Sequence, residues 1–194
     1  MSLNYLKKEK VNTVLAIDPA SHSLAWCIMQ RIDGELVLVK SDKLSFMKNS
    51  TIEDKFSQIK FGITSICDMY KPDVCVIEQS VYIQNFQTSR LLSYIIGFTW
   101  GMASFTCKRV MDVSPLVWRS GVGYKNLTGK DKDALKENGQ KKNIELKKKE
   151  ERKRRVRVII EEYFNADDLD LGDDDIVDAV GIAIWYWKVV NPDD

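Results

Sequence analysis

The chain lacks the features that mark membrane, secreted and zinc-binding proteins. It has no run of eighteen apolar residues, so no transmembrane helix is expected. Its four cysteines are widely spaced and form no CxxC pair, which indicates buried thiols in a reducing compartment. Because His22 is the only histidine, a zinc site is not expected either. These absences favour a cytoplasmic protein with no membrane partner.

A nearly balanced total charge conceals a strong separation of charge along the chain. The formal net charge is +1 over 194 residues. Residues 124–157 contain 14 Lys or Arg against 6 Asp or Glu, whereas residues 158–194 contain 1 against 11. A basic segment beside an acidic one is typical of a protein that binds a polyanion and holds cations at its reaction centre.

Four acidic residues stand where apolar segments would carry them together. Asp18 and Glu78 each end a short apolar run, whereas Asp175 and Asp178 open a long apolar segment. Asp175 and Asp178 are three residues apart, so they would share one face of a helix. Repulsion within such a cluster raises pKa values, and a bound divalent cation relieves it. The pattern therefore predicts a metal-dependent nuclease.

Each acidic residue alone has a simpler explanation. Asp18 precedes a proline, as turn residues often do, and Glu78 would also fit a surface strand end. Asp173 and Asp174 would complement a helix dipole, although Asp174 is also a substitute ligand four residues before Asp178. The dipole explanation fails for Asp178, which lies beyond the first helical turn in an apolar run. The combination favours the metal site.

The apolar patterns predict an α/β protein. Strands and helices follow in the order β-β-β-α-β-α-β-α…α, which implies a mixed five-stranded sheet with helices on both faces. Asp33-Gly34 is a hairpin signal. We expect a single domain over residues 1–194 with a basic helical insertion at about 124–157. The predicted strands are 13–17, 24–31, 35–40, 74–77 and 109–113. The predicted helices are 51–70, 88–106, a short one from Ser114-Pro115, the second half of 130–164, and 173–188, with loops at 121–129 and 165–172.

These motifs resemble those of the RuvC-type Holliday junction resolvases, which belong to the RNase H-like nuclease superfamily. The match covers most of the chain in the right order, and only the combination of motifs is specific. Ile17-Asp18-Pro19 with Ala25-Trp26 resembles the first motif, Val76-Ile77-Glu78-Gln79 with Asn85 the second, Ser114-Pro115 through Gly123 the segment after the fifth strand, and Asp175-Ile176-Val177-Asp178-Ala179 the terminal D-x-x-D-A motif.

The resemblance implies an RNase H-like fold, a homodimer and a crossover junction endodeoxyribonuclease acting on branched DNA such as Holliday junctions. Carried over by position, Asp18, Glu78, Asp175 and Asp178 are the catalytic metal ligands. Two magnesium ions, with manganese as a substitute, would activate a water and stabilise the leaving 3′-oxygen. No small-molecule cofactor and no nucleophilic side chain would then be needed.

Several positions depart from the family pattern. The usual glycines are replaced by Ala20 and Ala25, which would be unfavourable if the backbone were left-handed there. Where the family has an aromatic that stacks on a base, this chain has Val81 with Tyr82 beside it. Tyr82 is the candidate for that role, and a packing tyrosine is the alternative. The long basic segment fits a phage-type member and leaves the kind of branched DNA open.

The basic segment supplies candidates for contacts with DNA phosphates. The alternative is a solvated helix face paired with Glu150 and Glu151. His22, four residues after Asp18, would either assist proton transfer or be an exposed turn residue. The candidate phosphate-binding residues are Lys147, Lys148, Lys149, Arg152, Lys153, Arg154 and Arg155.

Three other functions compete with resolution of branched DNA. The same fold could cleave an RNA–DNA hybrid, which assays on the two substrates would distinguish. A non-catalytic module for structured nucleic acid is disfavoured by the presence of all four carboxylates. An actin-like ATPase is disfavoured because the chain is too short for two lobes and lacks a second phosphate loop.

Overall fold

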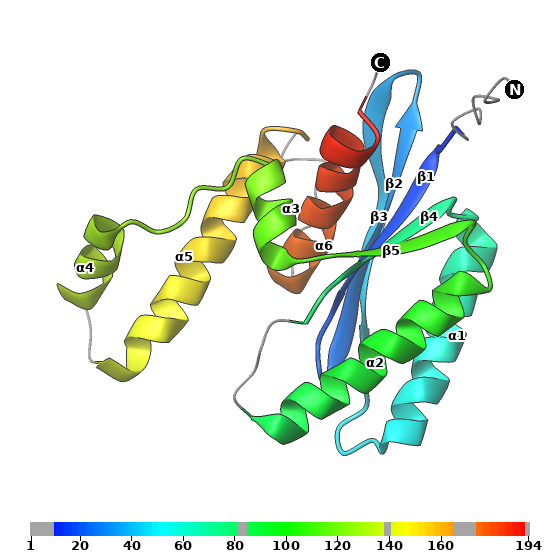
Figure 1. Cartoon of the computed structure of the whole chain (residues 1–194), viewed down its shortest axis with the longest axis horizontal. Coiled ribbons are helices and arrows are strands. Elements are labelled where there is room, and N and C mark those ends of the chain that lie inside the picture. Colours follow the sequence, from blue (N-terminus) through cyan, green and yellow to red (C-terminus); the bar gives the residue numbers. More distant parts are fainter. Residues whose placement is uncertain (1–9, 81–84, 138–140, 165–173, 193–194) are drawn as a thin grey trace, which may run out of the picture.

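A mixed five-stranded sheet in the order β3-β2-β1-β4-β5 lies at the centre of the structure (Figure 1). It is seen in a computed structural model that describes residues 10–80, 85–137, 141–164 and 174–192. β1 runs antiparallel to β2 and parallel to β4, and β4 runs parallel to β5. The strands are β1 (Thr13–Pro19), β2 (Ser23–Ile32), β3 (Glu35–Ser45), β4 (Val74–Glu78) and β5 (Arg109–Val113).

The first hairpin forms at the predicted turn. Asp33 and Gly34 both have positive φ, at 53° and 89°, which is the conformation that Asp-Gly hairpin turns favour. β3 continues five residues beyond the predicted end at Lys40, because its polar second half still pairs with β2 at the edge of the sheet. Because this half of the strand is polar, it lacks the apolar pattern from which strands were predicted.

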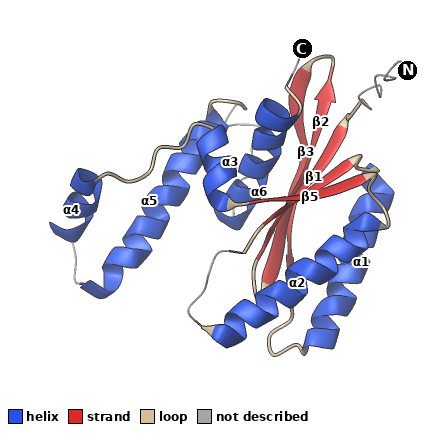
Figure 2. Cartoon of the chain, in the orientation of Figure 1, coloured by secondary structure: helices blue, strands red, loops and turns tan. Residues whose placement is uncertain are grey.

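Helices cover both faces of the sheet, as expected (Figure 2). On one face lie α1 (Ile52–Tyr70) and α2 (Phe86–Ser104), and on the other lies α6 (Asp174–Trp185) with α3 (Pro115–Gly121) beside it. Thr51 caps α1 in a reciprocal capping box with Asp54. α2 begins two residues before the predicted start, because the Asn85 side chain accepts from the Thr88 N–H.

The alternation of β1 divides its apolar residues between two cores. Leu15 and Ile17 face α1 and α2, whereas Val14 and Ala16 face α6. α6 is buried for almost its whole length, because it packs directly on β1 and β2. The helix ends at Trp185 and the chain continues as a π-helical turn, Tyr186–Val190, where the sequence predicted one helix to about residue 188.

The basic segment forms two helices, α4 (Gly129–Glu137) and α5 (Lys141–Glu161), rather than one. The sequence reading missed α4, although Thr128 and Asp131 form a reciprocal cap at its start. α5 packs on α6 through the buried residues Val156 and Ile160. α4 contacts α5 and lies well away from the sheet (Figure 1).

Two further expectations can be compared with the described residues. No helix among them is both long enough and apolar enough to cross a bilayer. All four cysteines are free and buried, as the sequence indicated.

Candidate active site

One row of neighbouring residues crosses the sheet at the carboxyl ends of β1 and β4. Asp18 pairs with Ala25, and Ala25 pairs with Lys43 on β3. On the other side of Asp18 lies Glu78, which pairs with Val113 of β5. Since paired residues point to the same face of a sheet, all five side chains point toward the layer of α6. The row therefore brings two acidic residues from remote parts of the sequence side by side.

α6 lies over this row and adds the other two carboxylates. Asp178 is only 6% exposed, and Asp175 lies one turn closer to the start of the helix, where it is partly exposed. The charges of Glu78, Asp178 and Asp175 all act on the carboxyl group of Asp18. The four acidic residues singled out in the sequence thus come together in space, at the end of the sheet where ligands bind in open α/β folds.

Crowding changes the acidity of two of these groups. Burial raises the pKa of Asp18 well above its usual range, and the neighbouring charge of Glu78 and a hydrogen bond to it raise that pKa further. Burial also raises the pKa of Asp178 to about 6, although the guanidinium of Arg119 opposes the effect. The cluster therefore retains protons that isolated carboxylates would lose.

α3 supplies two donors that the sequence analysis did not identify. The Trp118 indole donates to Glu78 Oε1 at 2.7 Å. Arg119 Nη2 lies 3.3 Å from Asp178 Oδ2 and 3.9 Å from Glu78 Oε1. Trp118 fits beside α6 only because residue 181 is glycine, where an added Cβ would lie 2.5 Å from the indole ring. The sequence signal for these donors was the Ser114-Pro115 start of α3, because the residue at which a helix begins determines which of its side chains share a face.

Asp175 has a different environment from the other three carboxylates. Lys153 Nζ of α5 lies 2.9 Å from its Oδ1, and Lys43 Nζ of β3 lies 3.2 Å from its Oδ2. Burial raises the pKa of Asp175, but the hydrogen bonds and charges of these two lysines outweigh burial and leave it below the usual range. Lys43 is a further residue that the sequence analysis missed.

The donor set suits a hard divalent cation. All four candidate ligands offer carboxylate oxygens, and Asp178 Oδ1 is buried without a hydrogen-bond partner. However, within the described parts of the chain, no three acidic, histidine or cysteine side chains already form a group that would hold an ion. Since Asp175 faces two lysines, it would have to exchange an ammonium for the ion. The residues thus fit a magnesium-type cation in their chemistry.

The remaining candidates near the site have different outcomes. Tyr82 and Asp173 lie outside the described residues, and Asp174 opens α6 without a described side chain. His22 is exposed, and its Nδ1 lies 3.4 Å from the Ser21 hydroxyl, which matches the exposed turn residue considered above.

The two alanines in place of the family's glycines need no left-handed backbone. Neither Ala20 nor Ala25 has a positive φ, and Ala25 is a fully buried strand residue. Its small side chain lies in the row between Asp18 and Lys43, below α6.

The basic run on α5 has two faces. One face lines a cavity of about 390 Å³ beside Asp178, which Arg119 also borders. On the other face, Arg154 and Arg155 bind Glu151 at 2.8–2.9 Å, and Arg155 also pairs with Asp131. Lys147 and Lys148 are half-buried. The α5 residues of the cavity are Leu146, Lys149, Arg152, Lys153 and Val156.

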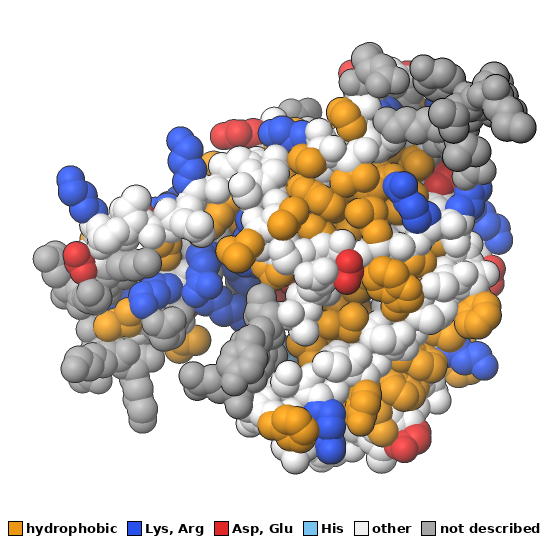
Figure 3. Space-filling view, in the orientation of Figure 1, with side chains coloured by type: hydrophobic (Ala, Val, Ile, Leu, Met, Phe, Trp, Pro, Cys, Tyr) orange, Lys and Arg blue, Asp and Glu red, His pale blue; other side chains and the backbone are white. Residues whose placement is uncertain are grey.

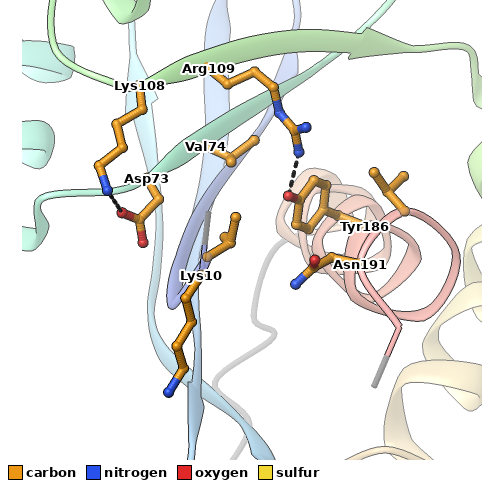
Figure 4. Close-up of a pocket in the computed structure, with 9 residues that line it drawn as sticks. Lys10, Asp73, Val74, Lys108, Arg109, Tyr186 and Asn191 are labelled. Carbon is orange, nitrogen blue, oxygen red and sulfur yellow. Dashed lines mark hydrogen bonds and ion pairs between the residues drawn. The ribbon is translucent and has the colours of Figure 1, made fainter. Parts of the chain in front are cut away.

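A second cavity, of about 280 Å³, lies at the opposite end of the sheet (Figure 4). Asp73 there accepts from Lys108 and from the backbone N–H groups of residues 12 and 13, and Arg109 donates to the Tyr186 hydroxyl. These contacts join the starts of β1, β4 and β5 to the turn after α6. The side chains of this cavity therefore serve the fold and lie far from the carboxylate row.

Comparisons with known proteins point to one family. The model of the family described as "Crossover junction endodeoxyribonuclease RuvC" matches residues 14–111, half of the chain, a range that includes Asp18 and Glu78. A relative of that name from Rickettsia bellii (strain OSU 85-389) is 30% identical over 84 residues. That alignment covers 43% of this chain and 54% of the relative, so the chain matches about half the relative's length. A relative of the same name from Dictyoglomus thermophilum is 22% identical over 174 residues, which cover 89% of this chain and 94% of the relative.

Solved structures agree on the fold. The structure of Thermus thermophilus RuvC matches with a TM-score of 0.66 at 11% identity, covering 90% of this chain and 94% of the other. The same protein in complex with a Holliday junction substrate matches with a TM-score of 0.61 at 13% identity and the same coverage. This likeness confirms the predicted RNase H-like architecture.

The raised pKa of Asp18 gives a prediction for stability. The folded protein retains a proton that the unfolded chain loses from about pH 4 upward, so the free energy of unfolding of the metal-free protein falls as the pH rises through this range. Asp18→Asn removes the ionisable group and is expected to raise the melting temperature in EDTA at pH 7.5. Each kcal/mol of relief corresponds to roughly 2–4 °C at this chain length.

Melting curves of both proteins from pH 4 to pH 8 test this prediction. The difference between them should shrink toward pH 4, and carboxyls elsewhere cancel because both proteins contain them. A variant that melts below the wild-type protein at pH 7.5 would show that Asp18 is not strained by its neighbours.

Proposed function

This chain belongs to the RuvC family of crossover junction endodeoxyribonucleases, and from that membership we propose that it nicks branched DNA such as Holliday junctions. The observation that carries the proposal is the convergence of Asp18, Glu78, Asp175 and Asp178 beneath α6. The proposal takes the chain as one RNase H-like domain in which α4 and α5 form a basic insertion. T. thermophilus RuvC, which shares the fold, has been seen in complex with a Holliday junction substrate.

We propose that the four carboxylates bind two magnesium ions and that manganese substitutes for them. When bound, such a pair activates a water molecule and stabilises the leaving 3′-oxygen. The unpartnered Oδ1 of Asp178 is a ligand ready for an ion. Because burial raises the pKa of Asp18, a proton on this carboxyl would leave on metal binding. Trp118 holds the Glu78 carboxylate by its indole N–H, so that this ligand keeps its orientation.

We propose that the cavity face of α5 binds the DNA backbone beside the scissile phosphate. Lys149, Arg152 and Lys153 face the space next to Asp178, where a strand must lie to be cut. Several phosphate contacts of this kind give affinity without sequence preference. Arg154 and Arg155 also belong to the basic run, but their pairing with Glu151 reduces what they can add. A junction has strands on several sides, which suits a basic helix that extends beyond the sheet.

We propose that the protein is a homodimer that associates through the outer face of α2. This face carries an exposed apolar stripe at helical spacing (Figure 3). Added Cβ atoms at Gly97 and Gly101 would meet nothing within 4 Å, so another helix could approach closely there. A two-fold dimer would present two cleavage sites to a four-way junction, whose arms are themselves related by symmetry. The large apolar members of the stripe are Phe86, Tyr94 and Phe105, which are 70%, 52% and 86% exposed.

The first prediction concerns cleavage. In magnesium, the wild-type protein is expected to nick a four-way junction faster than a three-way junction, a linear duplex or an RNA–DNA hybrid, and EDTA is expected to stop it. Asp18→Asn should lower the rate by about 100-fold or more, as expected when a charged group at the reaction centre is removed. Asp33→Asn, in the exposed hairpin turn, is the matched control and should cut at the wild-type rate.

The outcomes of this assay separate the candidate functions. Cleavage of the hybrid alone would indicate an RNase H-type enzyme, and tight binding without any cleavage would indicate a non-catalytic module. Full activity of Asp18→Asn would remove Asp18 from the mechanism.

The second prediction concerns the basic helix. Arg152→Gln is expected to weaken junction binding by the same factor for every sequence and to reduce the slope of log affinity against log salt by about one. Arg154→Gln removes the same charge from a residue already paired with Glu151, so its effect should be smaller. Fluorescence anisotropy at several salt concentrations measures both. Equal slopes for the wild-type protein and Arg152→Gln would show that Arg152 makes no phosphate contact.

The third prediction concerns the dimer. Tyr94→Glu places a charge in the α2 stripe and is expected to weaken self-association at least about tenfold, since an unpaired charge must then be desolvated. Leu116→Glu, at a similarly exposed apolar position on α3, is the control. Sedimentation equilibrium measures the dissociation constants. A monomeric wild-type protein, or a Tyr94→Glu dimer of unchanged affinity, would refute this interface.

A further inference from the structure

Lys153 links the basic helix to the carboxylate cluster. Its Nζ lies 2.9 Å from Asp175 Oδ1, and its side chain is only 11% exposed. Lys43 approaches the other carboxylate oxygen of Asp175 at 3.2 Å. Both oxygens that would serve a metal ion are therefore in contact with ammonium groups of the protein itself.

The same lysine also borders the space proposed for DNA. Lys153 lines the cavity next to Asp178, together with Arg119, Lys149 and Arg152. A backbone phosphate entering this cavity would meet several cations at once, and one of them, Lys153, also holds a candidate metal ligand. Its long, flexible side chain allows the ammonium to change partners without movement of the helix.

We propose that Lys153 exchanges between Asp175 and a DNA phosphate, so that binding of DNA releases Asp175 to receive magnesium. This inference rests on the proposed function and adds a regulatory role to the insertion. In the DNA-free protein, the Lys153 ammonium neutralises Asp175 and competes with the ion for it. When a phosphate enters the cavity, the ammonium moves to the phosphate and remains protonated throughout.

Such an exchange couples the two ligands thermodynamically. If a phosphate on Lys153 raises the affinity for metal, then metal must raise the affinity for DNA by the same factor. The DNA-free protein would bind magnesium weakly at the carboxylates. Metal binding would become favourable only when a DNA strand occupies the cavity. A nuclease of this design is restrained by its own DNA-binding helix until the substrate arrives.

Calorimetric titration of the DNA-free protein with Mn²⁺ tests the competition. Lys153→Gln is expected to bind Mn²⁺ roughly 5- to 30-fold more tightly than the wild-type protein, within the usual range of coupling between two sites. Lys153→Arg, which keeps the cation, should stay close to the wild-type affinity. Lys149→Gln removes a charge from the same cavity without an ion pair to Asp175, so it should leave the Mn²⁺ affinity unchanged.

Junction binding with and without Ca²⁺ then measures the coupling, with Ca²⁺ serving as an ion that is not expected to support cleavage. Ca²⁺ should tighten binding more for the wild-type protein than for Lys153→Gln, because the variant has no ammonium to release. An unchanged or weaker Mn²⁺ affinity in folded Lys153→Gln, or an equal gain in Lys149→Gln, would overturn the exchange.

Failure of this inference is distinguishable from failure of the proposed function. Asp18→Asn and Asp178→Asn are expected to lose Mn²⁺ binding, and if both bind as the wild-type protein does, the carboxylates are not the metal site. If they lose binding while Lys153→Gln matches the wild-type affinity, only the exchange is wrong.

Discussion

The burial of several carboxylates together, between α6 and the sheet, is the constraint on which the rest of this structure depends. Burying negative charge is unfavourable unless cations, protons or metal ions compensate it. Here the pKa of Asp18 is raised, so that it holds a proton to higher pH than an isolated carboxyl, while Asp178 faces Arg119 and Asp175 is held by Lys43 and Lys153. A divalent cation bound among the carboxylates would compensate their charge in place of the proton and the basic side chains. The arrangement therefore suits metal-dependent hydrolysis of a phosphodiester.

Two buried apolar cores, one on each face of the sheet, surround the carboxylates. The register of the sheet fixes Asp18 beside Glu78, and small residues let the covering elements approach. Ala25 leaves room below α6, and Gly181 leaves room for the Trp118 indole that orients Glu78. Burial of the carboxylates lowers the free energy of unfolding, and burial of the two apolar cores around them offsets this loss, as is common at functional sites.

The sequence predicted which carboxylates come together, because each of them is tied to a local pattern. Asp18 and Glu78 end buried strands, and the spacing of Asp175 and Asp178 matches one helix face. The basic half was not predictable in the same way, because Lys43 and Lys153 come from a polar edge strand and from a helix that is mostly charged. Lys153 shares a helix face with the buried Val156 and Ile160, but the spacing alone does not say that its ammonium contacts a carboxylate, because that depends on tertiary packing.

The fold shows the same division. Buried strands and capped helices were found to within a few residues, whereas the polar half of β3 and the helix α4 were missed for lack of apolar periodicity.

Proton release on metal binding tests the central claim most directly. Calorimetric titrations of the wild-type protein with Mn²⁺ near pH 6, in buffers of different ionisation enthalpy, measure the protons displaced. If crowded carboxylates form the site, the ions should displace protons as they bind. Asp178, whose pKa is about 6, should supply about half a proton per protein molecule at this pH, and Asp18, whose pKa is raised, should add to it. Binding of Mn²⁺ without proton release would contradict the account, because the ion would then sit on groups that were already ionised.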